Sequence, residues 1–176
     1  MQSDPAADFF SFAMGEFTAK FPRDRCYATN HMWARPIGLD DRFLDWTQRT
    51  ADASSEIRWR FGLSAYAVRL LQDVYFLDWE LDPGTTIGKR QMIGAIESKK
   101  AESDLYAPIA GTLSAINPAV LEDPALINAD PYGVGWLIEI TAAVPVEELL
   151  SPDRYSEHLE SAWEVAQRTI KGQANA

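Results

Sequence analysis

The residues best placed to do chemistry are two adjacent lysines, Lys99 and Lys100, in the middle of a short polar stretch. An apolar run from Met92 to Ile96 precedes them, and a second run from Leu105 to Ile109 follows. Two apolar segments around a turn-sized polar centre predict a β-hairpin with both lysines at its exposed tip. A primary amine displayed there is accessible to a modifying enzyme, and a group attached to it can swing. Taken alone, the pattern also fits an ordinary solvated turn.

Conventional catalytic and metal sites find no support in the sequence. It contains no glycine-rich phosphate loop and no Gly-x-Ser-x-Gly elbow. Two histidines are too few for a multi-histidine metal site, and the single cysteine, Cys26, cannot form an internal disulfide. Ser98 and Ser103 have no histidine near them in the sequence. We therefore predict a protein without catalysis of its own.

Composition sets the class of protein and its compartment. The chain has 176 residues, of which 47% are hydrophobic and 24% charged, as expected for one globular domain. Its net charge of -10 argues against nucleic acid as a partner, because phosphate contacts need a basic surface. No apolar run approaches the roughly 18 residues of a membrane-spanning helix. Residues 1–20 carry acids and resemble neither a transit peptide nor a secretion signal, so we expect the cytoplasm.

The elements that position the lysines are mainly short strands. The patterns predict a helix over 64–72 that begins at Ser64 and strands at 74–77, 86–96, 105–116 and 135–141, with a loop over 118–131. Such spacing indicates a mostly β fold with flanking helices, of the sandwich or barrel type.

Three further segments surround this core. Residues 1–20 form an N-terminal extension, and the spacing of Phe9, Ala13 and Phe17 fits an amphipathic helix over 8–17. We expect it either to pack on its own domain or to bind a partner. Residues 21–150 form the main domain, with an insertion at 37–58 whose aromatic spacing is compatible with a helix. Residues 151–176 form a C-terminal helix packed on the domain, with Ser151 as its N-cap.

The residues around the lysines resemble the lipoylation segment of the glycine cleavage system H proteins. That likeness rests on Glu97-Ser98-x-Lys100-Ala101-x-Ser103-Asp104-x-Tyr106-Ala107-Pro108. It continues in Asp130-Pro131-Tyr132-Gly133-x-Gly135-Trp136-Leu137-Ile138, and upstream in Phe61-Gly62-Leu63-Ser64-x-Tyr66-Ala67 and His31-Met32-Trp33. The resemblance covers about residues 21 to 160. It implies a lipoyl/biotinyl-type β-sandwich, the barrel-sandwich hybrid, with a short helix and a C-terminal helix.

The resemblance also implies a function. In the register of the family, Lys100 carries covalent lipoate, and the protein shuttles an aminomethyl group between glycine decarboxylase and aminomethyltransferase. Dihydrolipoyl dehydrogenase and a lipoate ligase or lipoyltransferase are the other implied partners. Asp104 matches an aspartate that pairs with the aminomethyl ammonium. Glu97 and its acidic neighbours are either recognition charges for the attaching enzyme or solvated tip residues.

Three positions depart from the family pattern. Met32 stands where the family has an acidic side chain, Gln72 where it usually has glycine, and Lys99 where it often has valine. These departures keep two alternatives open: an H-like lipoyl carrier that serves another pathway, such as sulfur oxidation, or an unmodified protein-interaction paralogue. Biotinyl domains and the lipoyl domains of oxo-acid dehydrogenases fit less well, because the residues beside the lysine differ from theirs.

Overall fold

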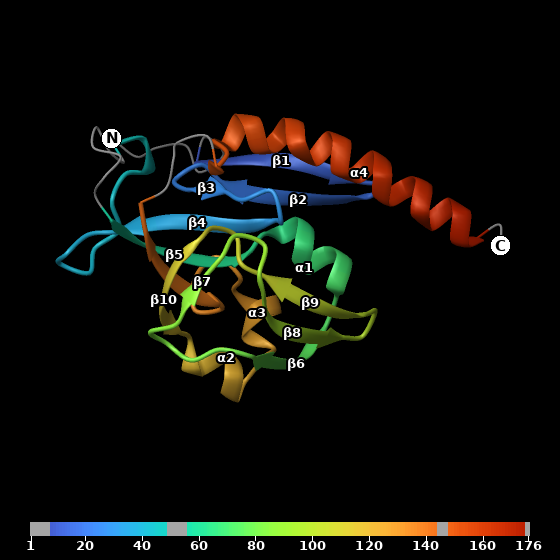
Figure 1. The fold of residues 1–176 in the computed structure, drawn as a ribbon. Coiled ribbons are helices and arrows are strands. Elements are labelled where there is room, and N and C mark those ends of the chain that lie inside the picture. The colour runs from blue at the N-terminus through green and yellow to red at the C-terminus, as the bar shows by residue number, and fades with distance from the viewer. Residues whose placement is uncertain (1–7, 49–55, 144–147, 175–176) are drawn as a thin grey trace.

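The computed structural model describes residues 8–48, 56–143 and 148–174. Within these ranges the chain forms short strands, four α-helices and a short 3₁₀ helix, shown in Figure 1. The strands are β1 (Phe9–Met14), β2 (Phe17–Pro22), β3 (Cys26–Tyr27), β4 (Met32–Ile37), β5 (Ile57–Leu63), β6 (Val74–Trp79), β7 (Thr86–Ile87), β8 (Met92–Ser98), β9 (Glu102–Tyr106), β10 (Gly111–Ile116) and β11 (Ile138–Ala142). The helices are α1 (Ala65–Leu71), α2 (Pro118–Glu122), α3 (Leu126–Ala129), α4 (Pro152–Ala174) and the 3₁₀ helix η2 (Trp46–Gln48).

Two antiparallel sheets pack face to face and enclose the main core. The larger sheet has the order β3-β4-β5-β11-β10-β7, and the smaller has the order β6-β8-β9. Alternate side chains of both sheets point inward and contact each other, as expected when each sheet buries one face. They include Trp59, Phe61 and Ile140 from the larger sheet and Leu77, Ile93, Ile96 and Leu105 from the smaller. The predicted fold class, a mostly β sandwich with flanking helices, is confirmed.

The predicted N-terminal helix over 8–17 is wrong, because this segment forms the β1–β2 hairpin. Met14 pairs with Phe17 across a two-residue turn, and of the two turn residues only Gly15 has a positive φ, +67°. Glycine at the first turn position is typical of a type II′ turn, which matches the twist of the flanking strands. Phe10 and Met14 alternate toward the protein, so the aromatic spacing serves a strand face instead of a helical stripe.

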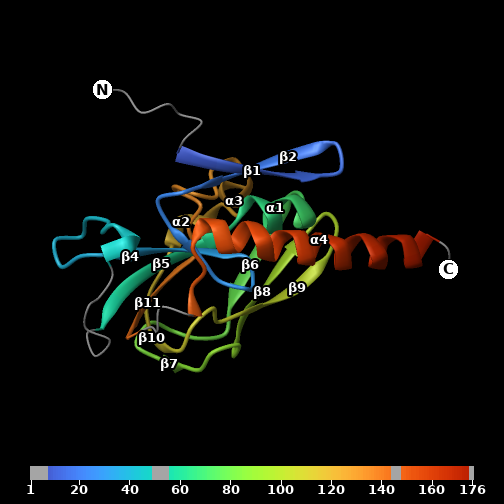
Figure 2. The same ribbon diagram turned by 90° about the horizontal axis from the view of Figure 1, so that it is seen from above.

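A second hydrophobic cluster joins this hairpin to the C-terminal helix. Phe10 and Phe21 pack with Tyr27, Tyr155 and Leu159, and the Tyr27 and Tyr155 rings stack with centroids 4.3 Å apart. Figures 1 and 2 show α4 beside the hairpin, with its C-terminal half extending beyond the body of the domain. The predicted cap is confirmed, because the Arg154 amide donates to Ser151 Oγ at 3.2 Å. In the parts of the chain that the structure describes, no helix is long and apolar enough to cross a membrane.

The predicted strands 86–96 and 105–116 are each divided in two. A turn over 88–91, in which Arg90 has a φ of +66°, separates β7 from β8, and a break after β9 that includes Pro108 separates β9 from β10. Each break moves the chain from one sheet to the other. The lysines therefore belong to the β8–β9 hairpin of the small sheet, while β7 and β10 pair with each other in the large sheet.

Two other segments also differ from expectation. In the 37–58 insertion, the Gly38 amide donates to the Arg42 carbonyl at 2.8 Å. A turn with Asp41 at φ +62° leads to an Ile37–Phe43 bridge, and not to the helix with which the aromatic spacing is compatible. The segment continues through η2, and residues 49–55 lie outside the described ranges. The predicted loop at 118–131 contains α2 and α3, and the Asn117 side chain caps α2 by accepting from the Ala119 amide.

Candidate functional site

The β8–β9 hairpin presents both lysines at its tip, as the sequence predicts. Glu97 pairs with Glu102 at the end of the ladder, and residues 98–101 form the connection. Lys99 and Lys100 are both exposed. Among the described residues, neither ammonium forms an ion pair or a hydrogen bond. An exposed primary amine on a defined tip fits attachment of an acyl group.

The hydroxyl of Ser98 fixes the shape of the tip from inside. Ser98 is buried, and its Oγ accepts from the amides of Lys100 at 3.3 Å and Ala101 at 3.2 Å. The Ser98 amide donates to the Ala101 carbonyl at 2.9 Å and closes the turn. Serine hydroxyls often hold such local turns in place. The backbone of Lys100 is therefore held while its side chain points outward from a stable base.

The tip is also attached to the segment that follows α1. The Lys99 amide donates to the Asp73 carbonyl at 2.9 Å. Asn128, from α3, fixes the backbone on both sides of Asp73: its Nδ2 donates to the Gln72 carbonyl at 2.6 Å, and its Oδ1 accepts from the Val74 amide at 2.9 Å. Segments far apart in the sequence thus hold the lysine-bearing turn.

The backbone conformation at Gln72 explains why the family usually has glycine at this position. Its φ is 59° and its ψ is -142°, a combination that residues with a Cβ rarely adopt. The chain must turn there to leave α1 and enter β6 with the Asp73 carbonyl facing the tip. This departure from the family pattern leaves the backbone path intact and adds strain.

Acidic side chains share the outer face of the small sheet beside the tip. In register, Glu97 lies opposite Glu102, and Ala95 lies between Asp78 and Asp104. The Tyr106 hydroxyl donates to Asp104 Oδ2 at 3.5 Å. The structure therefore brings the predicted residues Glu97 and Asp104 onto the face that ends at Lys100. Such a face can attract a cationic group or a basic partner.

Met32 does not join this face. Its side chain is 1% exposed and belongs to the main core. Asn30, which lies before His31 and Met32, reaches β9 instead: its Nδ2 donates to the Tyr106 carbonyl at 3.0 Å. A buried thioether cannot pair with an ammonium, so Met32 supplies no charged partner, whereas Asp104 is exposed on the outer face of the small sheet.

His31 has a structural role. Its Nδ1 lies 2.8 Å from the Tyr155 hydroxyl, which also contacts Ser64 Oγ at 2.8 Å. Burial, and secondarily the nearby His158, lowers the pKa of His31 to about 4. The ring is therefore neutral at pH 7 and links α4 to the loop before β4. Ser64 precedes α1 as predicted, but its hydroxyl binds Tyr155 and does not cap the helix.

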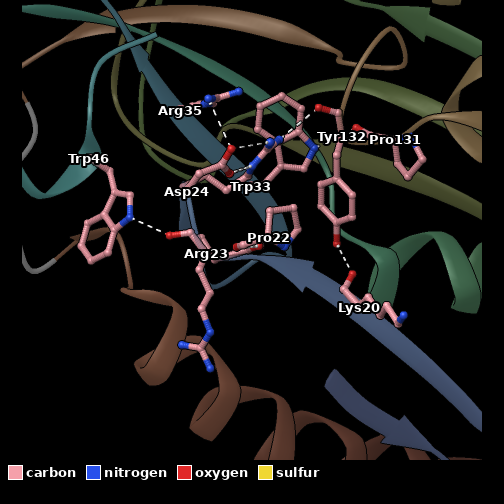
Figure 3. Close-up of polar contacts among 11 residues, drawn as sticks. Lys20, Pro22, Arg23, Asp24, Trp33, Arg35, Trp46, Pro131 and Tyr132 are labelled. Atoms are coloured by element: carbon pink, nitrogen blue, oxygen red, sulfur yellow. Dashed lines mark hydrogen bonds and ion pairs between the residues drawn. The ribbon is translucent and has the colours of Figure 1, made fainter. Parts of the chain in front are cut away.

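Sequence reasoning missed the contacts that attach the N-terminal hairpin to the domain. The Tyr132 hydroxyl donates to the Lys20 carbonyl at 3.2 Å and accepts from the Ala65 amide at 2.8 Å. Figure 3 shows Tyr132 between Lys20 and Trp33, whose indole donates to the Pro131 carbonyl at 2.9 Å. The buried Arg25 guanidinium donates to the Tyr132 carbonyl at 3.0 Å. The motif around Tyr132 was the one signal in the sequence for these contacts, but it could not identify Lys20 in β2, which is more than a hundred residues away, as the partner of Tyr132.

A metal centre is not a competing candidate within the described residues, since no group of three or more His, Cys, Asp or Glu side chains in them could hold an ion. The tip lysine on its rigid hairpin is the strongest candidate site.

Comparison with known proteins gives consistent matches. The family model described as Glycine cleavage H-protein matches residues 45–162. The glycine cleavage system H protein of Pseudoalteromonas atlantica is 38% identical over 144 residues, which cover 81% of this chain and 98% of that protein. That of Carboxydothermus hydrogenoformans is 34% identical over 145 residues, 81% of this chain and 97% of that protein. The crystal structure of a glycine cleavage system H protein from Mycobacterium marinum superposes with a TM-score of 0.63 at 33% identity, over 80% of this chain and 99% of that one.

Proposed function

Because this chain belongs to the glycine cleavage system H-protein family, we propose that it carries lipoate as an amide on Lys100. Members of the family are carriers and not catalysts. The observation that supports the proposal is the rigid β8–β9 tip, which exposes the Lys100 amine while Ser98 and Asp73 hold its backbone. Lipoate would supply a dithiolane that opens and closes by thiol–disulfide exchange. The protein supplies the position of the arm and its shelter.

In this function the protein shuttles an aminomethyl group between glycine decarboxylase and aminomethyltransferase. Asp104 is the exposed carboxylate that we assign to the ammonium of that group, because a charge-assisted hydrogen bond retains it. Glu97 and Glu102 lie closer to the tip and are assigned to recognition by a lipoate ligase or lipoyltransferase. Dihydrolipoyl dehydrogenase is the expected partner for reoxidation.

The decisive test is an intact-mass spectrum of the full chain expressed with lipoate and a lipoate ligase. We expect one lipoyl mass, mapped to Lys100, that Lys100→Ala abolishes and Lys99→Ala does not. Lys99→Ala is the matched control, because that neighbouring lysine is also exposed at the tip. A chain that stays unmodified beside a modified H protein would contradict the proposal and favour an interaction paralogue.

The burial of Met32 favours one second candidate, a lipoyl carrier that serves another pathway. A glycine-cleavage assay with purified partner enzymes separates the two. Activity of the lipoylated chain, reduced severalfold by Asp104→Asn and not by Glu97→Gln, supports glycine cleavage. A lipoylated chain without such activity supports the second candidate.

A further inference from the structure

A groove lies beside the lysine-bearing tip, between α1 and Phe17 of the N-terminal hairpin. The groove has a volume of about 490 Å³, and its lining includes Phe17, Val68, Arg69, Gln72, Asp73 and Pro131. Phe17, at the start of β2, forms one wall and lies outside the residues that the family model matches. The volume falls within the range of small-molecule sites. We call this feature the α1 groove.

The α1 groove lies within reach of a group on Lys100. The Lys99 amide is 2.9 Å from the carbonyl of Asp73, a lining residue, so standard backbone lengths place the Cα of Lys100 within about 8 Å of that carbonyl. A lipoyl-lysine arm of about a dozen bonds extends about 14 Å. Figures 1 and 2 both show the β1–β2 turn and the β8–β9 tip on the same side of the molecule.

The lining suits a neutral, sulfur-containing ring. Phe17, Val68 and Pro131 supply apolar surface, and sulfur makes favourable contacts with aromatic rings. The Arg69 guanidinium lies 4.2 Å from the centroid of the Phe17 ring, and Asp73 carries the opposite charge. The cation on Phe17 disfavours an ammonium next to that wall. The side-chain amide of Gln72 can hydrogen-bond the amide of an arm.

We propose that the α1 groove, which Phe17 of the N-terminal hairpin walls on one side, is a resting site for the oxidised, neutral dithiolane of the lipoyl arm. This inference rests on the proposed attachment at Lys100. It assigns to Phe17, which lies outside the residues that the family model matches, the role of contacting the dithiolane. It also separates the arm at rest from the acidic face around Asp104.

The test uses the unlipoylated full chain and free lipoamide, so it does not depend on attachment. In a titration followed by amide NMR, lipoamide should shift resonances of α1 and of residues around Phe17. Phe17→Ala should weaken this binding by about twofold to tenfold, as expected for a lost sulfur–aromatic contact. Phe9→Ala is the matched control, because Phe9 lies on the same hairpin and is 41% exposed against 37% for Phe17. It should leave binding unchanged.

The lipoylated chain gives a second measurement. Phe17→Ala should speed reduction of the arm by a water-soluble phosphine about threefold, and Phe9→Ala should not. Shifts confined to the Asp104 face, or no effect of Phe17→Ala in either measurement, would overturn the inference even if mass spectrometry places lipoate on Lys100. Lipoamide shifts in the groove of a chain that no ligase modifies would uphold the site and reject the attachment.

Discussion

Replacing Gln72 with glycine should stabilise the protein. A residue with a Cβ at φ 59° and ψ -142° is strained, and such conformations cost about 1–3 kcal/mol. Glycine removes that strain, but its greater freedom in the unfolded chain offsets about 0.5–1 kcal/mol. With mid-range values for both terms, the free energy of unfolding should therefore rise by about 1 kcal/mol. For a chain of this size, the melting temperature should then rise by about 2–4 °C.

The matched control is Gln72→Ala. The Gln72 amide donates to the Val68 carbonyl at 2.9 Å, and its carbonyl accepts from Asn128 at 2.6 Å. Both bonds belong to the backbone of residue 72 and persist in either variant. Alanine keeps the Cβ and hence the strain, so its stability should stay within about 0.5 kcal/mol of the parent. Urea unfolding of the three proteins checks the order, and a glycine variant no more stable than the alanine variant would refute the reasoning.

Three further predictions concern single side chains. Ser98→Ala should lower the free energy of unfolding by about 1 kcal/mol. It should also speed hydrogen exchange of the Lys100 and Ala101 amides, which donate to the Ser98 hydroxyl, and unchanged exchange would contradict the role of Ser98 in the turn. Burial lowers the pKa of His31 from 6.5 to about 4, so the unfolded chain binds the proton more tightly. The free energy of unfolding should be highest above about pH 6.5 and fall by roughly 3 kcal/mol toward pH 4. Asparagine tolerates the positive φ of this position, so His31→Asn should remove this fall when the free energy of unfolding is measured with urea at each pH. Met32→Glu should lower the free energy of unfolding by about 3 kcal/mol or more at pH 8 and by less at pH 5, because the core disfavours the charged carboxylate. Equal stability of the variant and the parent at pH 8 would mean that this side chain lies at the surface.

The lysine-bearing hairpin could be predicted from the sequence because its signal is local. The apolar runs from Met92 to Ile96 and from Leu105 to Ile109, with a turn-sized polar centre between them, are enough to predict two paired strands. The short helix after Ser64 and the cap at Ser151 were predictable for the same reason. What the local signal could not supply was the sheet to which each strand belongs.

The N-terminal segment shows why local reasoning fails elsewhere. Its aromatic residues satisfy both a helical and a strand period, so the sequence alone leaves the choice open. The choice depends on the surface that the segment covers, formed by Tyr27 and by Tyr155 more than a hundred residues away. Alternate side chains of one hairpin face cover this apolar surface, and the Gly15-Glu16 turn permits the hairpin.

The position of Lys100 depends on such distant contacts more than on its own strands. A two-stranded hairpin is at best marginally stable alone. Here β6 pairs with β8, the Asp73 carbonyl holds the Lys99 amide, and Asn128 fixes the backbone on either side of Asp73. An attaching enzyme therefore meets a tip whose geometry is set by the whole small sheet and by α3. The residues around the lysine identify the target, but only the folded domain presents it, since the Ser98 bonds that close the turn are joined by the bond from the Lys99 amide to Asp73, a residue outside the hairpin.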